Sequence, residues 1–146
     1  HISVPNVDGP KRSLQMAIKD ARIALDRIAY INAHATSTPV GDLNEAKAIA
    51  EVFEGHRPYV TSTKSMTGHL LGAAGAIEAM ICVKTVENDI VPPTINFTEG
   101  DEDPEIDYKL NFTFNKPQKR TVNVALSNTF GFGGHNASII VKKFKG

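Results

Sequence analysis

The longest apolar stretch of the chain, residues 70–86, is the feature that most constrains the fold. It contains Glu78, Lys84 and two glycines, but apolar residues occur at nearly every angle around a helix. A helix that is apolar nearly all round is normally buried. This stretch is too short and too charged for a comfortable membrane span. The sequence therefore predicts a helix from Gly68 or His69 to about residue 88 that lies at the centre of the fold.

Helical and strand-like segments alternate along the rest of the chain. Apolar residues at three-and-four spacing predict helices over residues 10–25 and 43–53. The predicted strands are short and mostly apolar, and they span residues 28–33, 59–63, 122–127 and 137–144. The paired prolines 92–93 and the acidic residues 99–105 predict a surface excursion. This order of elements is typical of an α/β protein, with a layered mixed sheet covered by helices.

Length, charge and cysteine content narrow the class of protein. The 146 residues have an ordinary apolar fraction, which predicts one domain over residues 1–146. Sixteen basic and sixteen acidic side chains cancel, so no global field favours nucleic acid. One cysteine cannot form an internal disulfide, and we expect a reducing, cytoplasmic setting. Because the chain starts at His1 without a methionine, we expect it to be part of a longer protein.

Three loops hold the residues that could carry chemistry, and each follows a predicted strand. They are residues 32–39 with His34, residues 62–69 with His69, and the glycine-rich residues 130–136 with Phe132. In layered α/β sheets, polar sites collect where strands end and helices begin. We therefore expect the loops on one rim of the sheet, provided that the preceding strands are parallel. A purely structural alternative is that each histidine caps the end of a strand or helix.

His34 and His69 are the candidate catalytic pair. His69 is predicted at or near the first turn of the long helix, where the dipole and free backbone amides disfavour an added proton. We therefore expect a neutral imidazole that donates a hydrogen bond, with His34 as its partner. Two neutral imidazoles directed at one oxygen could stabilise an enolate that forms at a thioester carbonyl. This arrangement suits carbon–carbon bond formation.

Four charged residues are candidates to support the histidines. Lys64 is either an ordinary solvated lysine or a buried cation that orders the site. Glu78 lies in an apolar helix and needs a cation or hydrogen bonds. We expect it to anchor Lys64, a neighbouring loop or a bound cation rather than to touch His69. Asp42 and Glu45 have the spacing of a capping box at a helix start, although their charge could help to hold Lys64.

Two further features have weaker chemical meaning. Residues 131–134 are flexible enough for their amides to point at an oxyanion, but they open no helix and so predict no dinucleotide site. Cys82 lies inside the long apolar helix, where a thiol is normally inert. The histidines lack the spacing of metal ligands, and no second thiol is present. We therefore expect neither a metal nor a cofactor.

The three loops closely resemble the C-terminal half of the elongating beta-ketoacyl-acyl carrier protein synthases of the synthase II type. The resemblance runs from about Val4 to Phe144 and includes residues 91–96 after the long helix. It implies a thiolase-like fold of two similar halves, usually a homodimer, with this chain as the second half. It also implies decarboxylative condensation of malonyl-acyl carrier protein with an acyl group held on the enzyme as a thioester.

The resemblance assigns roles to four of the charged or titratable residues. His34 and His69 match two histidines that bind the malonyl thioester and assist its decarboxylation. Lys64 matches the active-site lysine of the family, and Glu78 matches the carboxylate near it. The cysteine that carries the acyl chain belongs to the first half of such enzymes and has no counterpart in this chain.

The resemblance also assigns the walls of the substrate channel. Phe132 matches a gating phenylalanine whose backbone amide helps to form the oxyanion hole, and Phe130 precedes it. Thr36 and Thr38 match threonines that hydrogen-bond the phosphopantetheine arm of the carrier protein. Two histidines favour elongating over initiating synthases. A polyketide-type ketosynthase and a non-catalytic partner that resembles a chain-length factor are the alternatives.

Overall fold

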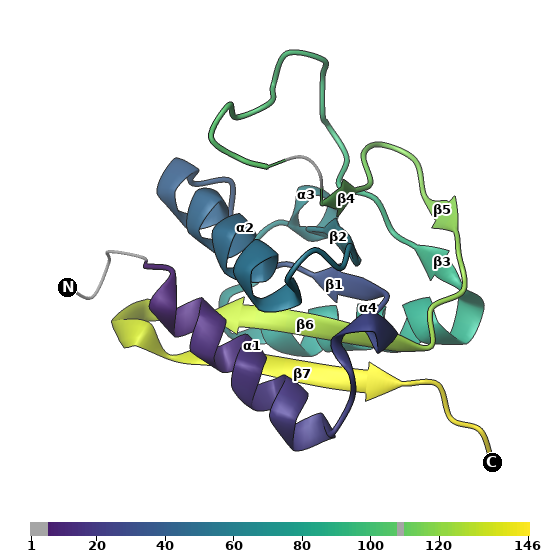
Figure 1. Ribbon diagram of the computed structural model, residues 1–146. Helices are drawn as coiled ribbons and strands as arrows, with labels where there is room; N and C mark the ends of the chain where they lie inside the picture. The colour runs from purple at the N-terminus through teal and green to yellow at the C-terminus, as the bar shows by residue number, and fades with distance from the viewer. Residues whose placement is uncertain (1–5, 108–109) are drawn as a thin grey trace.

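The computed structural model describes residues 6–107 and 110–146 (Figure 1). Residues 1–5, where the predicted domain and the resemblance begin, lie outside this part. The regular elements, in chain order, are α1 (Asp8–Ala21), η1 (Leu25–Arg27), β1 (Tyr30–Asn32), α2 (Pro39–Phe53), β2 (Tyr59–Thr61), α3 (Lys64–Thr67), η2 (Leu71–Ala73), α4 (Ala74–Asn88), β3 (Ile90–Val91), β4 (Asn111–Phe112), β5 (Gln118–Lys119), β6 (Val124–Phe130), η3 (Phe132–Gly134) and β7 (Asn136–Lys142).

The main sheet is mixed, and its strand order is β4-β2-β1-β6-β7. Strand β1 lies between β2 and β6 and is parallel to both, with Ile31 in register with Val60 and Leu126. Strand β7 returns antiparallel to β6. The loops after β1, β2 and β6 therefore leave the sheet at one edge, as the parallel arrangement requires. Strands β3, β4 and β5 were not predicted, because two residues are too few to show a pattern.

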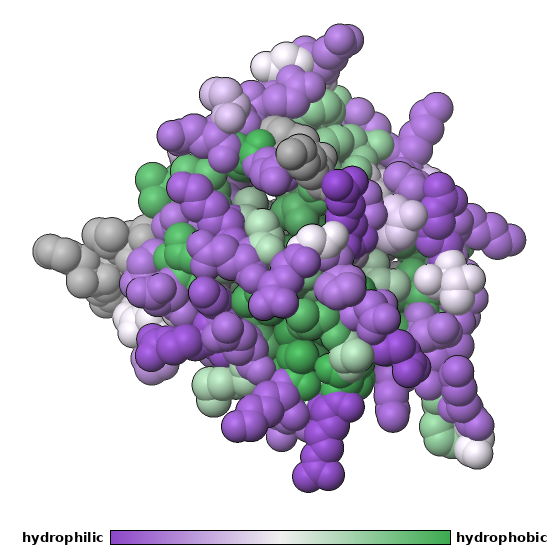
Figure 2. All heavy atoms as spheres, viewed as in Figure 1, coloured by the Kyte–Doolittle hydropathy of each residue, from purple (hydrophilic) through white to green (hydrophobic). Residues whose placement is uncertain are grey.

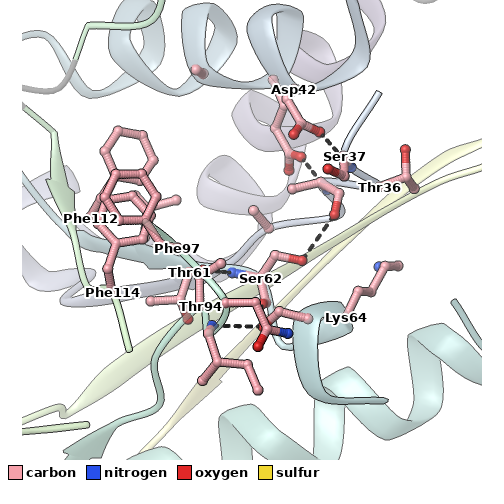
Figure 3. A pocket seen from close by; sticks show the side chains of 18 of the residues that line it. Thr36, Ser37, Asp42, Thr61, Ser62, Lys64, Thr94, Phe97, Phe112 and Phe114 are labelled. Carbon is pink, nitrogen blue, oxygen red and sulfur yellow. Dashed lines mark hydrogen bonds between the residues drawn. The ribbon is translucent and has the colours of Figure 1, made fainter. Parts of the chain in front are cut away.

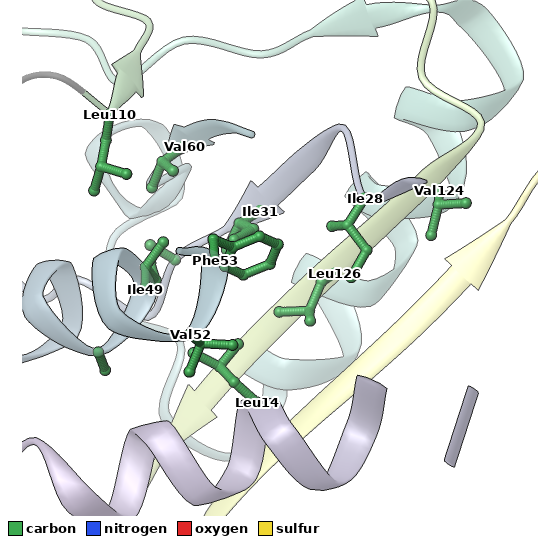
Figure 4. Packing of buried hydrophobic residues seen from close by; sticks show 12 residues of the cluster. Leu14, Ile28, Ile31, Ile49, Val52, Phe53, Val60, Leu110, Val124 and Leu126 are labelled. Carbon is green, nitrogen blue, oxygen red and sulfur yellow. The ribbon is translucent and has the colours of Figure 1, made fainter. Parts of the chain in front are cut away.

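Helices cover both faces of this sheet (Figure 1). Helices α1 and α2 pack on one face, where Leu14, Ile49 and Phe53 contact the apolar side chains of β1 and β6 (Figure 4). Helix α4 packs on the other face, where Cys82 and Val86 join a second cluster. Hydrophilic residues cover most of the face seen in Figure 2, with hydrophobic residues gathered near its centre. The layered α/β prediction is confirmed.

The long helix begins later than its sequence predicts. Residues 64–67 form the short helix α3, which ends at Gly68 with φ 73°, and a 3-10 turn precedes α4. The predicted start at Gly68 or His69 is therefore wrong. The prediction that the long helix is buried is confirmed only for the side of α4 that faces the sheet. On its other side, Met80 and Val83 are 61% and 39% exposed.

Candidate active site

The edge at which β1, β2 and β6 end brings the two histidines together. The ring centroids of His34 and His69 are 5.5 Å apart, and the rings are nearly perpendicular at 87°. Phe130, at the end of β6, contributes a third ring, 5.5 Å from that of His34. The rim expected from the sequence is thus present, with residues from three loops in one cluster.

His34 is half-buried and neutral at ordinary pH. Burial, followed by the electrostatic effects of Lys64 and His69, lowers the pKa of His34 from 6.5 to about 4. Its Nδ1 atom is buried and has no hydrogen-bond partner among the described residues. His34 therefore has the neutral imidazole that was expected at this site. The main cause of its low pKa is burial, not a helix dipole.

His69 is exposed in this chain and is oriented by the turn that precedes α4. The backbone N–H of Leu71 donates to His69 Nδ1 at 3.2 Å. Leu71 has φ 50°, an unusual value for a leucine, and this turn directs its N–H back at the ring. In a neutral ring an accepting Nδ1 leaves the proton on Nε2, which is then a donor. The predicted position of His69 in the first turn of the long helix is wrong, because α4 begins at Ala74.

Lys64 and Glu78 form a buried ion pair close to the histidines. The Lys64 Nζ atom donates to both carboxylate oxygens of Glu78, at 2.6 and 2.8 Å. Burial raises the pKa of Glu78, and the hydrogen bond from Lys64 counteracts this shift. Lys64 is therefore the buried cation of the two alternatives, and Glu78 anchors it as expected.

Glu45 holds the backbone that carries His34. This carboxylate is only 3% exposed and accepts the N–H groups of His34 and Ala35 at 2.9 and 2.8 Å. Asn128 donates a third hydrogen bond from Nδ2 at 3.1 Å. Burial raises the pKa of Glu45 to about 6. The capping-box prediction is wrong for Glu45, because α2 already begins at Pro39.

The loop before α2 presents the two threonines of the predicted channel. Its N-cap residue is Thr38, whose hydroxyl lies 3.3 Å from that of Thr36. Asp42, in the first turn of α2, accepts the backbone N–H of Ser37 at 3.2 Å and so links the loop to the helix. Burial raises the pKa of Asp42. Asp42 thus orders the loop but is not the capping residue that its spacing suggested.

A cavity of about 790 Å³ opens between α2, the ends of β1 and β2, and the segment after β3 (Figure 3). Thr36, Lys64 and His69 line its polar part. Its far wall is aromatic, where Phe97 stacks on Phe114 with ring centroids 3.9 Å apart. Neither this aromatic wall nor Asn128 was predicted from the sequence. A buried polar residue inside an apolar strand was the available signal for Asn128.

The glycine-rich loop turns tightly after β6. Gly133 and Gly134 both have φ 78°, which favours glycine, and the N–H of Gly131 donates to the carbonyl of His135 at 2.8 Å. The backbone of Phe132 starts the 3-10 turn η3. The side chain of Phe132 lies outside the described part of the structure.

Cys82 is buried at 1% exposure, and burial raises the pKa of its thiol to about 12. This cysteine is therefore an inert core residue.

Among the described residues, no group of three or more histidine, cysteine or acidic side chains is arranged to hold a metal. In the same part of the chain, no helix is both long enough and apolar enough to cross a membrane.

The chain is similar to known beta-ketoacyl synthases. The family model described as "Beta-ketoacyl synthase, C-terminal domain" matches residues 1–98. The chain is 45% identical to the 3-oxoacyl-[acyl-carrier-protein] synthase 2 of Synechocystis sp., over 99% of the chain and 35% of the relative. The chain thus spans about a third of the length of this curated relative.

Solved structures show the same fold. A beta-ketoacyl synthase from Burkholderia phymatum superposes with a TM-score of 0.91 at 36% identity, over 99% of this chain and 35% of that one. The ketosynthase of the AntDE:AntF complex, a type II polyketide system, gives 0.91 at 35% identity, over 99% and 36%. The fold is therefore thiolase-like, and the chain belongs to the beta-ketoacyl synthase family, where it matches the C-terminal domain.

Proposed function

We propose that this chain is the C-terminal part of a 3-oxoacyl-[acyl-carrier-protein] synthase, an acyltransferase of fatty acid elongation. The observation that carries the proposal is the paired arrangement of a neutral His34 and a His69 whose Nε2 is a donor. The 45% identity to a synthase 2 supports the same reaction. The substrates are malonyl-acyl carrier protein and an acyl group held as a thioester on a cysteine of the same enzyme.

The two imidazoles act as fixed hydrogen-bond donors to the malonyl thioester oxygen. When the carboxylate leaves as carbon dioxide, its bonding electrons move through the α-carbon to that oxygen and form an enolate. Donors that are already oriented stabilise this charge without reorganisation. The α-carbon of the enolate then attacks the acyl thioester, a carbon–carbon bond forms, and the cysteine leaves as a thiolate.

Lys64 and Glu78 maintain this donor pair. The charge of Lys64 is the second cause of the low pKa of His34, after burial, so the lysine helps to keep that ring neutral. Glu78 holds Lys64 in place through both carboxylate oxygens. Loss of either side chain removes a fixed charge close to the histidines. Glu45 and Asp42 complete the support by holding the loop of His34.

The remaining predicted residues form the path of the substrate. The hydroxyls of Thr36 and Thr38 are suited to hydrogen bonds with the phosphopantetheine arm, since Thr36 lines the cavity. Phe132 acts as the gate beside the acyl pocket and supplies an oxyanion-hole amide, with Phe130 next to His34. Gly133 and Gly134 give this gate the backbone freedom to move.

The partner is an acyl carrier protein that bears acyl or malonyl phosphopantetheine. A structural neighbour that is a ketosynthase in complex with its acyl-carrier protein supports this assignment. We also propose a cytoplasmic homodimer for the complete enzyme, without nucleic acid or membrane partners. A polyketide-type ketosynthase is less favoured, because the identity is 35% to that neighbour and 45% to the fatty acid enzyme.

The test uses the full-length protein that contains this chain. Release of carbon dioxide from malonyl-acyl carrier protein and formation of the 3-oxoacyl product are measured separately. His34→Ala and His69→Ala should each strongly reduce decarboxylation and affect acyl transfer to the cysteine less. His56→Ala, an exposed histidine after α2, is the matched control and should behave as wild type. Unimpaired decarboxylation in the His34 or His69 variant would refute the proposed roles.

A further inference from the structure

Two serines outside the proposed mechanism are linked to His34 by a continuous row of hydrogen bonds. Ser13 Oγ in α1 lies 2.8 Å from Ser138 Oγ in β7. Ser138 Oγ donates to Asn128 Oδ1 in β6 at 2.8 Å. Asn128 Nδ2 in turn donates to Glu45 Oε2 in α2 at 3.1 Å. The row therefore crosses four elements and ends at the carboxylate that holds the His34 backbone.

The number of available hydrogens sets the direction of every bond in this row. A serine hydroxyl has one hydrogen, and that of Ser138 is used on Asn128, so Ser13 must be the donor to Ser138. Ser138 can donate only to the carbonyl oxygen of the Asn128 amide. The opposite amide orientation would turn that oxygen toward the Glu45 carboxylate, where two acceptors repel each other. The Glu45 carboxylate, which can only accept, and the Ser138 hydroxyl, when it donates, therefore favour the same orientation, in which Asn128 donates to Glu45.

The orientation of Asn128 matters because Glu45 is the fixed point of the His34 loop. Its two oxygens accept the backbone N–H groups of His34 and Ala35, and its side chain is buried. A buried carboxylate that loses one of three donors shifts or takes up a proton. Either change moves the peptide that carries the His34 ring. Hydrogen bonds aligned in one direction also polarise and strengthen each other.

We propose that Ser138 is a positioning residue for the decarboxylation step, which it supports by fixing the Asn128 amide and, through Glu45, the backbone of His34. Ser13 completes the row by occupying the free lone pair of Ser138. The inference rests on the proposed function for its catalytic consequence. The hydrogen-bond row itself does not depend on that function.

The experiment compares three β7 variants of the full-length protein. Ser138→Ala removes the donor, and Ser138→Thr keeps it. Ile140→Val is the matched control, because Ile140 lies on the same side of β7, packs against the core and has no side-chain atom that could join the row of hydrogen bonds. Two quantities are measured: amide hydrogen exchange of the segment 33–36, and kcat and KM for malonyl decarboxylation.

Ser138→Ala should speed exchange at residues 33–36 and leave exchange in β2 unchanged. It should lower kcat by about threefold to tenfold with little change in KM, the effect expected from losing one neutral hydrogen bond. Ser138→Thr should restore both quantities. Ile140→Val should change neither, since general loosening of β7 does not reorient Asn128. Ser138→Ala values equal to those of Ile140→Val would overturn the proposal, as would faster exchange with an unchanged kcat.

Ser13→Ala keeps the test decisive if Ser138→Ala does not fold. It removes only the outermost donor, so it should shift exchange and kcat in the same direction by a smaller factor, and no effect on either would overturn the proposal. Failure of the proposed function is recognised separately. In that case wild type would not decarboxylate malonyl-acyl carrier protein. The exchange measurement would still test whether the row of hydrogen bonds holds residues 33–36 in place.

Discussion

The Lys64 ammonium donates to both oxygens of the Glu78 carboxylate, and the two side chains are only 6% and 2% exposed. Lys64 opens α3 and Glu78 lies in α4, so the pair joins the two helices on either side of His69. A buried ion pair stabilises little by itself, but its members depend strongly on each other. Loss of either member should therefore be costly, and Lys64 is also the second cause, after burial, of the low pKa of His34.

Breaking this ion pair should destabilise the protein far more than breaking an exposed one. Lys64→Met or Glu78→Gln leaves a partner buried without compensation and should lower the free energy of unfolding by about 3–5 kcal/mol. The double variant Lys64→Met/Glu78→Gln should lose less than the sum of both. Denaturant unfolding of the full-length protein measures these values.

The exposed pair Lys84–Glu87, with side chains 72% and 54% exposed, is the control for this measurement. Lys84→Met should change the free energy of unfolding by less than about 0.5 kcal/mol. Equal losses in the free energy of unfolding for Lys64→Met and Lys84→Met would show that the buried pair contributes no more to stability than the exposed pair.

His34 and Glu45 should give opposite pH dependences of stability. The folded pKa of His34, about 4, lies below its ordinary 6.5, so the native state binds fewer protons between these values. Its contribution to stability is therefore lost as pH falls through that window. The pKa of Glu45 is raised from 4.5 to about 6, so the native state binds more protons there and stability falls as pH rises.

Thermal unfolding between pH 4 and pH 7 tests both signs in full-length variants. Relative to wild type, His34→Asn should become more stable as pH falls, whereas Glu45→Gln should become more stable as pH rises. His56→Asn, which replaces an exposed histidine after α2, is the control. Difference curves that are flat for both variants would contradict the assigned causes.

Phe132→Ala should separate the two partial reactions of the proposed enzyme. A phenyl ring that precedes flexible glycines can move across a pocket mouth, so its loss should change acyl loading more than malonyl decarboxylation. The rates of acyl transfer to the enzyme and of carbon dioxide release are compared in the same preparation. Phe144→Ala, at a residue that is 90% exposed, is the control. Equal losses in both reactions would count against a gate.

Residues 1–146 expressed alone should not form a 3-oxoacyl product. Without an acyl-thioester acceptor no new carbon–carbon bond can form, and Cys82 is buried with a raised pKa. Leu71 and Met80 are 76% and 61% exposed, so the isolated chain should also self-associate. Product assays with Cys82→Ser as the control, together with size-exclusion chromatography, measure these outcomes. Turnover that Cys82→Ser abolishes would overturn the assignment of the nucleophile to another part of the enzyme.

Local patterns in the sequence were sufficient for the layered architecture and for the three candidate loops. Hydrophobic periodicity and strand-length apolar runs reflect which faces must be buried, and both act over a few residues. The same locality explains the errors. Asp42 and Glu45 have capping-box spacing, but Pro39 is preorganised for the first turn and starts α2 earlier. Gly68 and the turn at Leu71 likewise delay α4.

The sequence by itself determined which residues could form the site, because motifs and a buried charge in an apolar helix are readable without a fold. The tertiary structure alone decided how those residues meet. Parallel pairing of β1 with β2 and β6 brings His34 to within 5.5 Å of both His69 and Phe130. The tertiary structure also decided that Glu45, in α2, accepts the backbone N–H of His34. Such contacts join residues far apart in the chain, and their geometry depends on strand register and burial, which no local pattern encodes.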